Sequence, residues 1–280
     1  MPSGKRSKQQ RREAAAVGGK PPPVRSKGAP RGPRQASPRA LAIGGGVLVL
    51  VVVGVVLALV LGRGGSSSGI PAGTPTIGRI DVNSLPGAAE INSLYKGIPQ
   101  KGLYLGSSLA PVQMVMYIDL QCPVCQAFEV DNMPTIVRKY VRTGKVRIEL
   151  KPWEFIGPDS IRGQAATIAA SLQNKAFDFA GVLYDNQGTE NTGWLNDSML
   201  AQIAASVPGL NVPTLFSQRS SAAVKKQVSA VDASAQADNV QGTPTVLVGK
   251  NGTKPKDVTA PGNAPTLQEV ESAIAAALGG

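Results

Sequence analysis

The sequence predicts an α/β domain that is preceded by a single transmembrane helix and a disordered basic tail. Three observations support this prediction. An apolar, β-forming run ends at two cysteines that are separated by two residues. A long block of helical periodicity then lies between two predicted strands. Near the N-terminus, 22 consecutive residues carry no charge and are apolar or glycine.

Residues 1–40 form the basic tail. They contain eleven of the 29 Lys and Arg residues of the chain but only one of its 18 acidic residues, so most of the formal net charge of +11 lies there. Pro, Gly and Ser separate these charges and large apolar side chains are scarce, so we expect the tail to be disordered. Basic arms can bind phosphate, but membrane topology explains this charge more simply than binding of nucleic acid does.

Residues 41–62 are predicted to cross a membrane. As a helix they would extend about 33 Å, which is enough to cross the hydrocarbon core of a bilayer. A cleavable signal peptide has a shorter apolar region, which makes cleavage the weaker alternative. The positive-inside rule places the tail in the cytoplasm and the remainder outside it. We therefore expect a single-pass protein of the cell membrane.

Residues 63–79 are rich in Gly, Ser and Pro and are predicted to form a flexible linker. About 200 residues follow, over 80–280, which is enough for one domain with its own core. This part of the chain is nearly neutral, because the excess of basic residues lies in the tail.

The dithiol, Cys122 and Cys125, directly follows the apolar run Met114–Leu120. Pro123 fits the first turn of a helix, so a helix should begin at or beside Cys122. The unpaired N–H groups and partial positive charge of a helix N-terminus stabilise a thiolate. We therefore predict that Cys122 is the nucleophile and that Cys125, nearly one turn later, faces inward.

Other roles for the two cysteines are less consistent with the composition. The chain has two cysteines and no histidine, which argues against a conventional zinc site and excludes hydrolases that depend on histidine. An inert disulfide that closes a four-residue loop would contribute only about 2 kcal/mol. A redox-active pair is therefore the favoured interpretation, and it requires neither a metal nor a cofactor.

The elements around the dithiol are predicted from local patterns. A short first strand is expected within Ile98–Gly106, and the central strand within Ala110–Leu120. The helix that carries the dithiol should kink at Pro134. Lys145–Leu150 alternates polar and apolar residues, so it should form the next strand. Strand, helix and strand together would form a parallel unit.

A helical insertion is predicted over about 159–240. Apolar residues from Ile161 to Leu183 recur at spacings of three and four, as in one amphipathic helix. Asn196 and Asp197 provide caps for a second helix, and valines between positions 224 and 231 mark another.

The predicted C-terminal elements are a strand, a hairpin and a helix. The strand covers Thr245–Val248, and the hairpin turn falls at Asn251-Gly252. Thr266 opens the last helix, with Glu269 three residues later completing a capping box. Apolar residues from Leu267 to Leu278 are expected to face the core.

This order of elements resembles the thioredoxin superfamily, in particular the DsbA-like thiol–disulfide oxidoreductases, in which a helical domain interrupts the thioredoxin fold. The resemblance covers about residues 98–280. It rests on Y-I-D-L-Q-C-P-V-C-Q-A-F-E, on the following T-G-K-V-R-I, on the helical block, and on Q-G-T-P-T-V-L-V. It implies a thioredoxin fold with a helical insertion.

The resemblance also implies how the site is shaped. Thr243-Pro244 matches a dipeptide that lies against the dithiol with its proline cis, although without the resemblance a trans proline opening a strand would be favoured. The backbone of Thr243 would then pair with an extended substrate segment. Asp119 is a candidate for tuning the thiol or passing a proton, although an acid at a strand end is as often a helix cap or a solvated side chain. Pro123 and Val124 lie between the cysteines.

Two positions depart from the pattern of the best-known relatives. Val124 stands where strongly oxidising members often carry histidine, and Met116 stands where many carry a buried acid. Valine cannot donate a hydrogen bond to the thiolate, so a less oxidising disulfide is expected, other things being equal.

The resulting hypothesis is a membrane-tethered, extracytoplasmic thiol–disulfide oxidoreductase that introduces disulfides into exported proteins through Cys122 and Cys125. Its substrates would be exported proteins with free thiols, and the resemblance implies a quinone-linked membrane oxidase as redox partner. Two alternatives remain: a reductase or isomerase of the same fold, and a non-catalytic module that senses redox state or binds a partner.

Overall fold

The fold is described from a computed structural model of the chain. The structure describes residues 85–258 and 264–279. The predicted tail, transmembrane segment and linker therefore lie outside the described residues. Within the described ranges, no helix combines the length and the hydrophobicity that crossing a bilayer requires.

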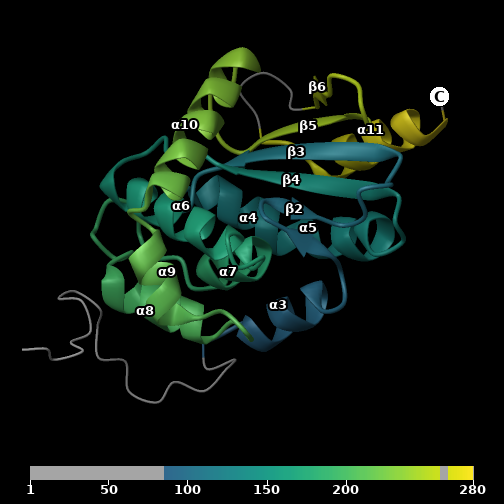
Figure 1. Ribbon diagram of the computed structural model, residues 1–280. Helices are drawn as coiled ribbons and strands as arrows, with labels where there is room; N and C mark the ends of the chain where they lie inside the picture. The colour runs from purple at the N-terminus through teal and green to yellow at the C-terminus, as the bar shows by residue number, and fades with distance from the viewer. Residues whose placement is uncertain (1–84, 259–263, 280) are drawn as a thin grey trace, which may run out of the picture. The chain divides into compact units, whose positions relative to one another are not determined.

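A six-stranded mixed sheet lies at the centre of the domain (Figure 1). The strand order is β1-β2-β4-β3-β5-β6, with β3 and β4 parallel and all other neighbours antiparallel. The predicted parallel strand–helix–strand unit is therefore confirmed. The strands are β1 (Gln100–Lys101), β2 (Tyr104–Leu105), β3 (Val112–Ile118), β4 (Val146–Pro152), β5 (Thr245–Lys250) and β6 (Lys256–Asp257).

The central strand β3 is buried on both faces, which explains its unbroken apolar sequence. Alternate residues from Val112 to Ile118 belong to the main core. Val115 and Tyr117 point the other way, into a smaller apolar cluster that also contains Ala235 of helix α10 (Ala222–Ala237). The strand that leads to the dithiol is thus held from both sides.

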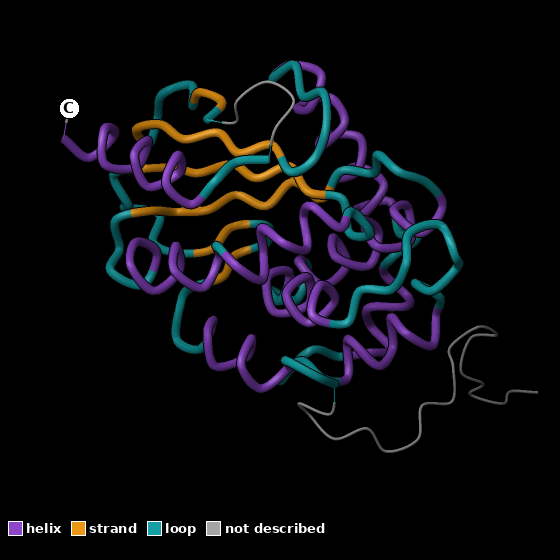
Figure 2. Tube along the Cα trace, turned by 180° about the vertical axis from the view of Figure 1, so that it is seen from behind, coloured by secondary structure: helices purple, strands orange, loops and turns teal. Residues whose placement is uncertain are grey.

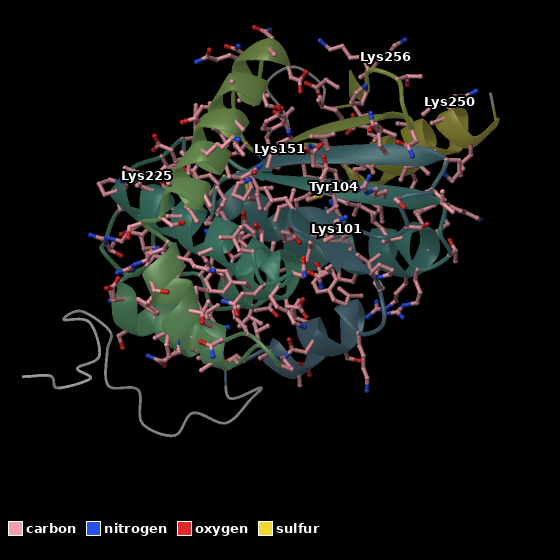
Figure 3. All side chains as sticks on the ribbon, viewed as in Figure 1. Lys101, Tyr104, Lys151, Lys225, Lys250 and Lys256 are labelled. Atoms are coloured by element: carbon pink, nitrogen blue, oxygen red, sulfur yellow. The ribbon has the colours of Figure 1, made fainter. Side chains whose placement is uncertain are left out.

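The neighbouring strand β4 alternates between buried and partly exposed residues, as its sequence predicts. On the face turned away from the main core, the guanidinium of Arg147 lies 3.9 Å from the ring centroid of Tyr104, and Lys151 pairs with Glu149 at 2.9 Å. Figure 3 labels Tyr104 and Lys151 on this part of the surface. These side chains are partly buried, so they cover this face of the sheet as well as pairing their charges.

The predicted helix after the dithiol consists of three shorter segments. These are α4 (Pro123–Asp131), α5 (Met133–Ile136) and the π-helical segment η1 (Val137–Val141). The break falls at Asn132, and Pro134 lies in the first turn of α5, where a proline costs no helical hydrogen bond. The expected kink at Pro134 is therefore a break two residues earlier.

The helical insertion lies at the end of the sheet where α4 begins (Figures 1 and 2). It starts at the C-terminal end of β4 and returns to the sheet at β5. Its helices are α6 (Pro158–Ser171), α7 (Ala176–Asp185), α8 (Asp197–Ala205), α9 (Val212–Gln218) and α10. The Asn196 side chain caps α8 by accepting a hydrogen bond from the Met199 N–H at 3.1 Å, as predicted.

The prediction of one amphipathic helix from Ile161 to Leu183 is wrong. The chain leaves α6 at Leu172 and enters α7 at Ala176, with Asn174 in the left-handed region at φ 58°. Ile161 and Leu172 are 53% and 45% exposed. Periodicity alone did not identify the buried face of α6, which is formed largely by small and polar residues.

A glycine allows α6 to approach the turn that precedes the dithiol. A Cβ atom at Gly163 would lie 2.6 Å from Cβ of Leu120 and 2.9 Å from Cδ2 of Leu195. These distances are shorter than carbon atoms tolerate, so only glycine fits without a shift of the helix. The insertion is therefore packed directly against the dithiol loop.

The C-terminal helix was predicted from the sequence, whereas helices α3 (Ala88–Tyr95) and α9 and the hairpin form of the first strand were not. The capping box of α11 (Leu267–Gly279) is confirmed, because Thr266 N–H donates to the Glu269 carboxylate at 2.8 Å and Glu269 N–H donates to the Thr266 hydroxyl at 3.2 Å. Leu278 is 38% exposed rather than in the core. Helices α3 (Ala88–Tyr95) and α9 were not predicted, and the expected first strand is the short hairpin of β1 and β2.

Candidate active site

The dithiol lies where β3 ends and α4 begins, as the sequence predicts. Cys122 is the N-cap residue of α4, with extended backbone, and Pro123 occupies the first turn. Both cysteines are free thiols. Cys122 retains 6% exposure, whereas Cys125 is fully buried. Only Cys122 can therefore meet a substrate without rearrangement of the helix.

The surroundings of Cys122 favour its thiolate. Its pKa is lowered to about 6, chiefly because the Cys125 thiol donates a hydrogen bond to it, with further support from the main-chain N–H groups of Cys125 and Val124. Burial acts in the opposite direction but is outweighed. At neutral pH the outer cysteine is thus largely ionised and ready to act as a nucleophile or a leaving group.

The inner cysteine has the opposite character. Burial raises the pKa of Cys125 well above its ordinary value, and the adjacent Cys122 raises it further. A thiol that stays protonated can donate its hydrogen bond to the neighbouring thiolate. The two sulfurs are therefore distinguished by their electrostatics as well as by their exposure.

The loop that precedes β5 faces the dithiol. The Thr243–Pro244 peptide bond is cis, as the family resemblance implied. Sγ of Cys122 lies 3.5 Å from the carbonyl oxygen of Thr243. The structure thus brings Thr243 into contact with the outer cysteine, although the two residues are more than a hundred positions apart in the sequence.

Asp119 is fully buried and its carboxylate binds main-chain N–H groups. One oxygen accepts from Gln121 at 2.9 Å, and the other accepts from Phe155 at 2.7 Å and from Ile156 at 2.9 Å. These contacts tie the turn before Cys122 to the loop after β4. Asp119 therefore does not cap α4, whose N-terminus has no side-chain cap, and its full burial also excludes a solvated role.

Sequence reasoning missed Gln121, which anchors the dithiol loop to the insertion. Its buried side chain donates to the Ser160 hydroxyl at 2.8 Å and to the side chain of Asn191 at 3.2 Å, and it accepts from the Asn191 N–H at 2.8 Å. These partners lie in α6 and in the loop before α8. No local signal identifies a glutamine as buried, because its partners are far away in the sequence.

Sequence reasoning also missed Glu129, a buried acid on α4. It lies four residues after Cys125 and is therefore on the same side of the helix. Burial raises its pKa to about 8, with an additional contribution from the charge of Asp185. The spacing from Cys125 was the available signal, since a residue one turn beyond an inward-facing thiol should also face inward.

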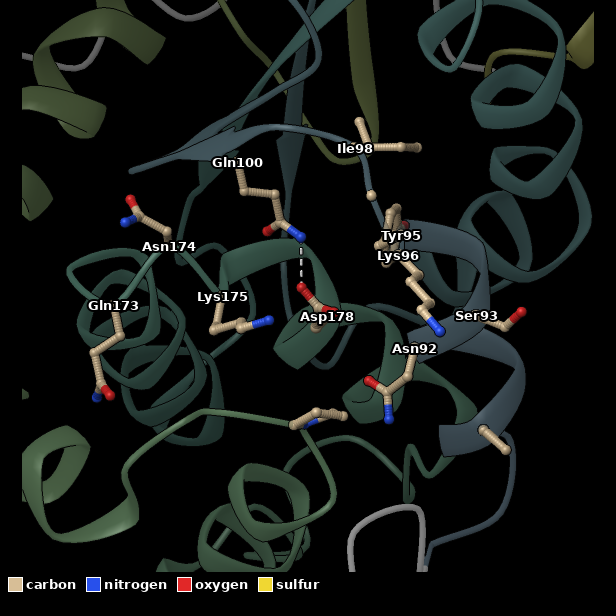
Figure 4. A pocket seen from close by; sticks show the side chains of 13 residues that line it. Asn92, Ser93, Tyr95, Lys96, Ile98, Gln100, Gln173, Asn174, Lys175 and Asp178 are labelled. Carbon is tan, nitrogen blue, oxygen red and sulfur yellow. Dashed lines mark hydrogen bonds between the residues drawn. The ribbon is translucent and has the colours of Figure 1, made fainter.

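A polar cavity of about 720 Å³ lies apart from these residues (Figure 4). It is formed by α3, β1 and the start of α7, and Gln100 donates a hydrogen bond to Asp178 within it. None of the predicted site residues lines it. Within the part of the chain that the structure describes, no group of His, Cys, Asp and Glu side chains is arranged to hold a metal ion.

A helix that begins at a Cys-x-x-Cys pair after a central strand, opposite a cis-proline loop, defines a thiol–disulfide oxidoreductase of thioredoxin fold. Comparison with known proteins agrees. The thioredoxin family model matches residues 99–270, which is more than half of the chain. The chain therefore belongs to the thioredoxin family, and within it to the DsbA-like oxidoreductases.

Two curated relatives come from Bacillus. The probable disulfide bond formation protein D of Bacillus cereus is 32% identical over 154 residues, which cover 54% of this chain and 71% of that protein. Disulfide bond formation protein D of Bacillus subtilis is 27% identical over 146 residues, covering 51% of this chain and 66% of that protein. These similarities support thiol–disulfide oxidoreductase activity.

Solved structures show the same fold. Oxidised BdbD from Bacillus subtilis superposes with a TM-score of 0.56 at 24% identity, covering 65% of this chain and 98% of that one. α-DsbA1 from Wolbachia pipientis superposes with a TM-score of 0.55 at 20% identity, covering 68% and 96%. The predicted thioredoxin fold with a helical insertion is thus confirmed.

The unequal thiols predict selective alkylation. With limiting iodoacetamide, the reduced protein should be modified at Cys122, and the rate should rise with pH around a midpoint near 6, where the pKa of Cys122 lies. Peptide mass spectrometry after the reaction identifies the modified cysteine. A Cys122→Ala variant provides the control and should react slowly. Preferential modification of Cys125 would contradict the assignment.

Burial of Glu129 predicts a specific dependence of stability on pH. The pKa of Glu129 is about 8 in the folded protein and near 4.5 in an unfolded chain. Unfolding therefore releases a proton between these pH values, and the stability associated with this group is present below about pH 4.5 and is lost as pH rises to 8. Glu129→Gln removes the titration, so the variant should gain stability relative to wild type across this window.

Urea unfolding of both proteins under reducing conditions, from pH 5 to pH 8, measures this difference. The relative gain at pH 8 should be on the order of a few kcal/mol. Glu190→Gln, at an exposed loop position, is the matched control and should leave the pH profile as it is. Parallel profiles for wild type and Glu129→Gln would show that Glu129 is ionised in the folded state.

Proposed function

We propose that this protein is a membrane-tethered, extracytoplasmic oxidase that introduces disulfides into exported proteins. The observation that carries the direction of transfer is the stabilised thiolate of Cys122, whose pKa is about 6. A stabilised thiolate favours the reduced dithiol, so the oxidised form tends to pass its disulfide on. The Bacillus relatives, which are named disulfide bond formation proteins, support the same direction.

The transfer is an exchange of sulfur–sulfur bonds. A substrate thiolate attacks Sγ of Cys122, the Cys122–Cys125 bond breaks, and Cys125 leaves with the electron pair and takes up a proton. A second substrate thiolate then attacks the substrate sulfur of the mixed disulfide, and Cys122 leaves as a thiolate. The substrate loses two electrons, which the dithiol holds until an oxidised partner removes them.

Substrates in this proposal are exported proteins with free thiols. An extended segment next to the reacting cysteine pairs with the main chain of Thr243, whose carbonyl oxygen lies 3.5 Å from Sγ of Cys122. Val124, which is 45% exposed, adds an apolar contact. Reoxidation is assigned to a membrane redox partner, by class a quinone-linked oxidase, as the family resemblance implies.

A trapping experiment tests the proposed exchange. Full-length protein with Cys125→Ala keeps the attacking thiol but lacks its intramolecular partner, so mixed disulfides with exported proteins should accumulate and disappear on adding a reductant. Cys122→Ala should form none. In parallel, oxidised wild type should speed the oxidative refolding of a reduced test protein.

Measurements of the reduction potential and of disulfide exchange distinguish the alternative functions. A reduction potential well below that of glutathione would indicate a reductase, and reshuffling of scrambled disulfides without net oxidation would indicate an isomerase. A folded protein that catalyses neither oxidation nor exchange would instead fit a redox-sensing or binding module.

Tethering by residues 41–62 is the part of the proposal that rests on sequence alone. With the eleven basic residues of the tail in the cytoplasm, the oxidoreductase domain faces the compartment where disulfides persist. Protease added to spheroplasts should digest the domain and spare a tag at residue 1. Protection of the domain with loss of the tag would overturn this topology.

A further inference from the structure

We propose that Tyr117, Ser234 and Asp238 form a latch that positions the loop 239–244 against Cys122. Tyr117 is then a positioning residue for thiol–disulfide exchange: it does not touch the substrate, but it sets where Thr243 stands relative to the reacting sulfur. The inference rests on the oxidoreductase activity itself and not on the proposed direction of transfer or on the membrane tether.

The latch is a partly buried network of three side chains, of which Tyr117 is fully buried. The hydroxyl of Tyr117 donates to Oδ2 of Asp238 at 2.8 Å and lies 2.6 Å from the hydroxyl of Ser234. A phenol has one proton, so when it donates to the carboxylate, the Ser234 hydroxyl donates to the phenol oxygen. Burial raises the pKa of Tyr117, so its hydroxyl keeps the proton that it donates throughout the physiological range.

Tyr117 holds both ends of the same loop. Its side chain holds Asp238, which is the C-cap residue of α10, and its main chain pairs with Thr245, the first residue of β5. Only residues 239–244 lie between these two anchors, and they include Thr243. A loop of six residues with both ends fixed to one strand residue has little freedom to move.

The same strand also positions the thiol. Cys122 comes five positions after Tyr117, and the intervening turn is fixed by the main-chain contacts of Asp119. Strand β3 thus positions both partners of this contact: the following turn places Sγ of Cys122, and the loop held by Tyr117 places the carbonyl oxygen of Thr243. Loss of the phenol hydroxyl releases the α10 end of the loop and leaves the cysteine side unchanged.

Contacts within the loop do not replace the latch. Val240 N–H donates to the Ala235 carbonyl at 2.9 Å, and the Thr245 hydroxyl donates to the Gly242 carbonyl at 2.8 Å. Both act within the same segment and neither ties it to β3. The other carboxylate oxygen of Asp238 lies 3.8 Å from the Lys254 ammonium, whose side chain is 75% exposed, so this pair provides a weak restraint.

Tyr117→Phe tests the latch, since it removes one oxygen and keeps the buried ring. The Thr243 side chain, as distinct from the carbonyl, is among the groups that lower the pKa of Cys122, so a loop that no longer holds this side chain near the sulfur should raise that pKa. If the rise is about one unit, alkylation of Cys122 at pH 6 should slow about fivefold, with no change at pH 8.5 where the thiol is ionised in both proteins. Thiolate absorbance over the same pH range measures the pKa directly.

Matched variants separate positioning from stability. Tyr140→Phe removes a hydroxyl that bonds to Glu271 between η1 and α11, 3.2 Å away, and should leave the Cys122 titration as in wild type. Asp238→Asn keeps an acceptor oxygen for the phenol and should retain most of the wild-type titration, whereas Asp238→Ala should reproduce the effect of Tyr117→Phe. Thermal unfolding is recorded for every variant.

The proposal is overturned if Tyr117→Phe unfolds at a lower temperature but titrates Cys122 as wild type does, because the latch would then only hold α10 on the sheet. If Tyr117→Phe does not fold, Asp238→Ala decides the question by the same titration. A rise in the Cys122 pKa in Asp238→Ala, with Asp238→Asn close to wild type, supports the latch. Coincident Cys122 titration curves for wild type, Asp238→Asn and Asp238→Ala refute it.

Discussion

The negative charge on Cys122 is the feature on which the rest of the site depends. This residue is nearly buried, and a charge away from water is costly unless donors are held around it. The donors are the Cys125 thiol and main-chain N–H groups of the first turn of α4. Each donor stays close to the Cys122 sulfur only while the start of α4 is held in place. The contacts of Asp119 and Gln121, which fix the turn before the helix, therefore support the charge without touching it.

Position along α4 determines which groups are charged. The first turn of a helix has N–H groups without helical partners, and Cys122 uses them. One turn later the N–H groups are already bonded within the helix. The hydrogen bonds that Cys125 makes are outweighed by its burial, and the burial of Glu129 is reinforced by the charge of Asp185. Burial raises the pKa of both. The two thiols and the buried acid of this short helix thus divide into one charged and two neutral members, and the neutral thiol serves as a donor to the charged one.

The parts of the fold that depend on local chemistry could be predicted from the sequence. The buried strand before the dithiol, the helix start at Cys122 and Pro123, and the capping box of α11 all follow from neighbouring residues. The break at Asn174 and the exposure of Ile161 could not, because they depend on how α6 packs against Leu120 and Leu195. Thr243 was found through family resemblance, whereas Tyr117, Gln121 and Glu129 have roles that only the tertiary structure defines.

Val124, the second of the two residues between the cysteines, affects the redox chemistry less directly than the loss of a side-chain donor suggests. Val124 cannot donate a side-chain hydrogen bond, yet its main-chain N–H is among the groups that lower the pKa of Cys122. Because main-chain donors and the Cys125 thiol do not depend on the side chain at this position, the thiolate keeps most of its support. A histidine would add a further donor, so its absence leaves the thiolate less stabilised without removing the main-chain support. The geometry of the helix start therefore sets the chemistry of the dithiol, and the intervening side chain adjusts its strength.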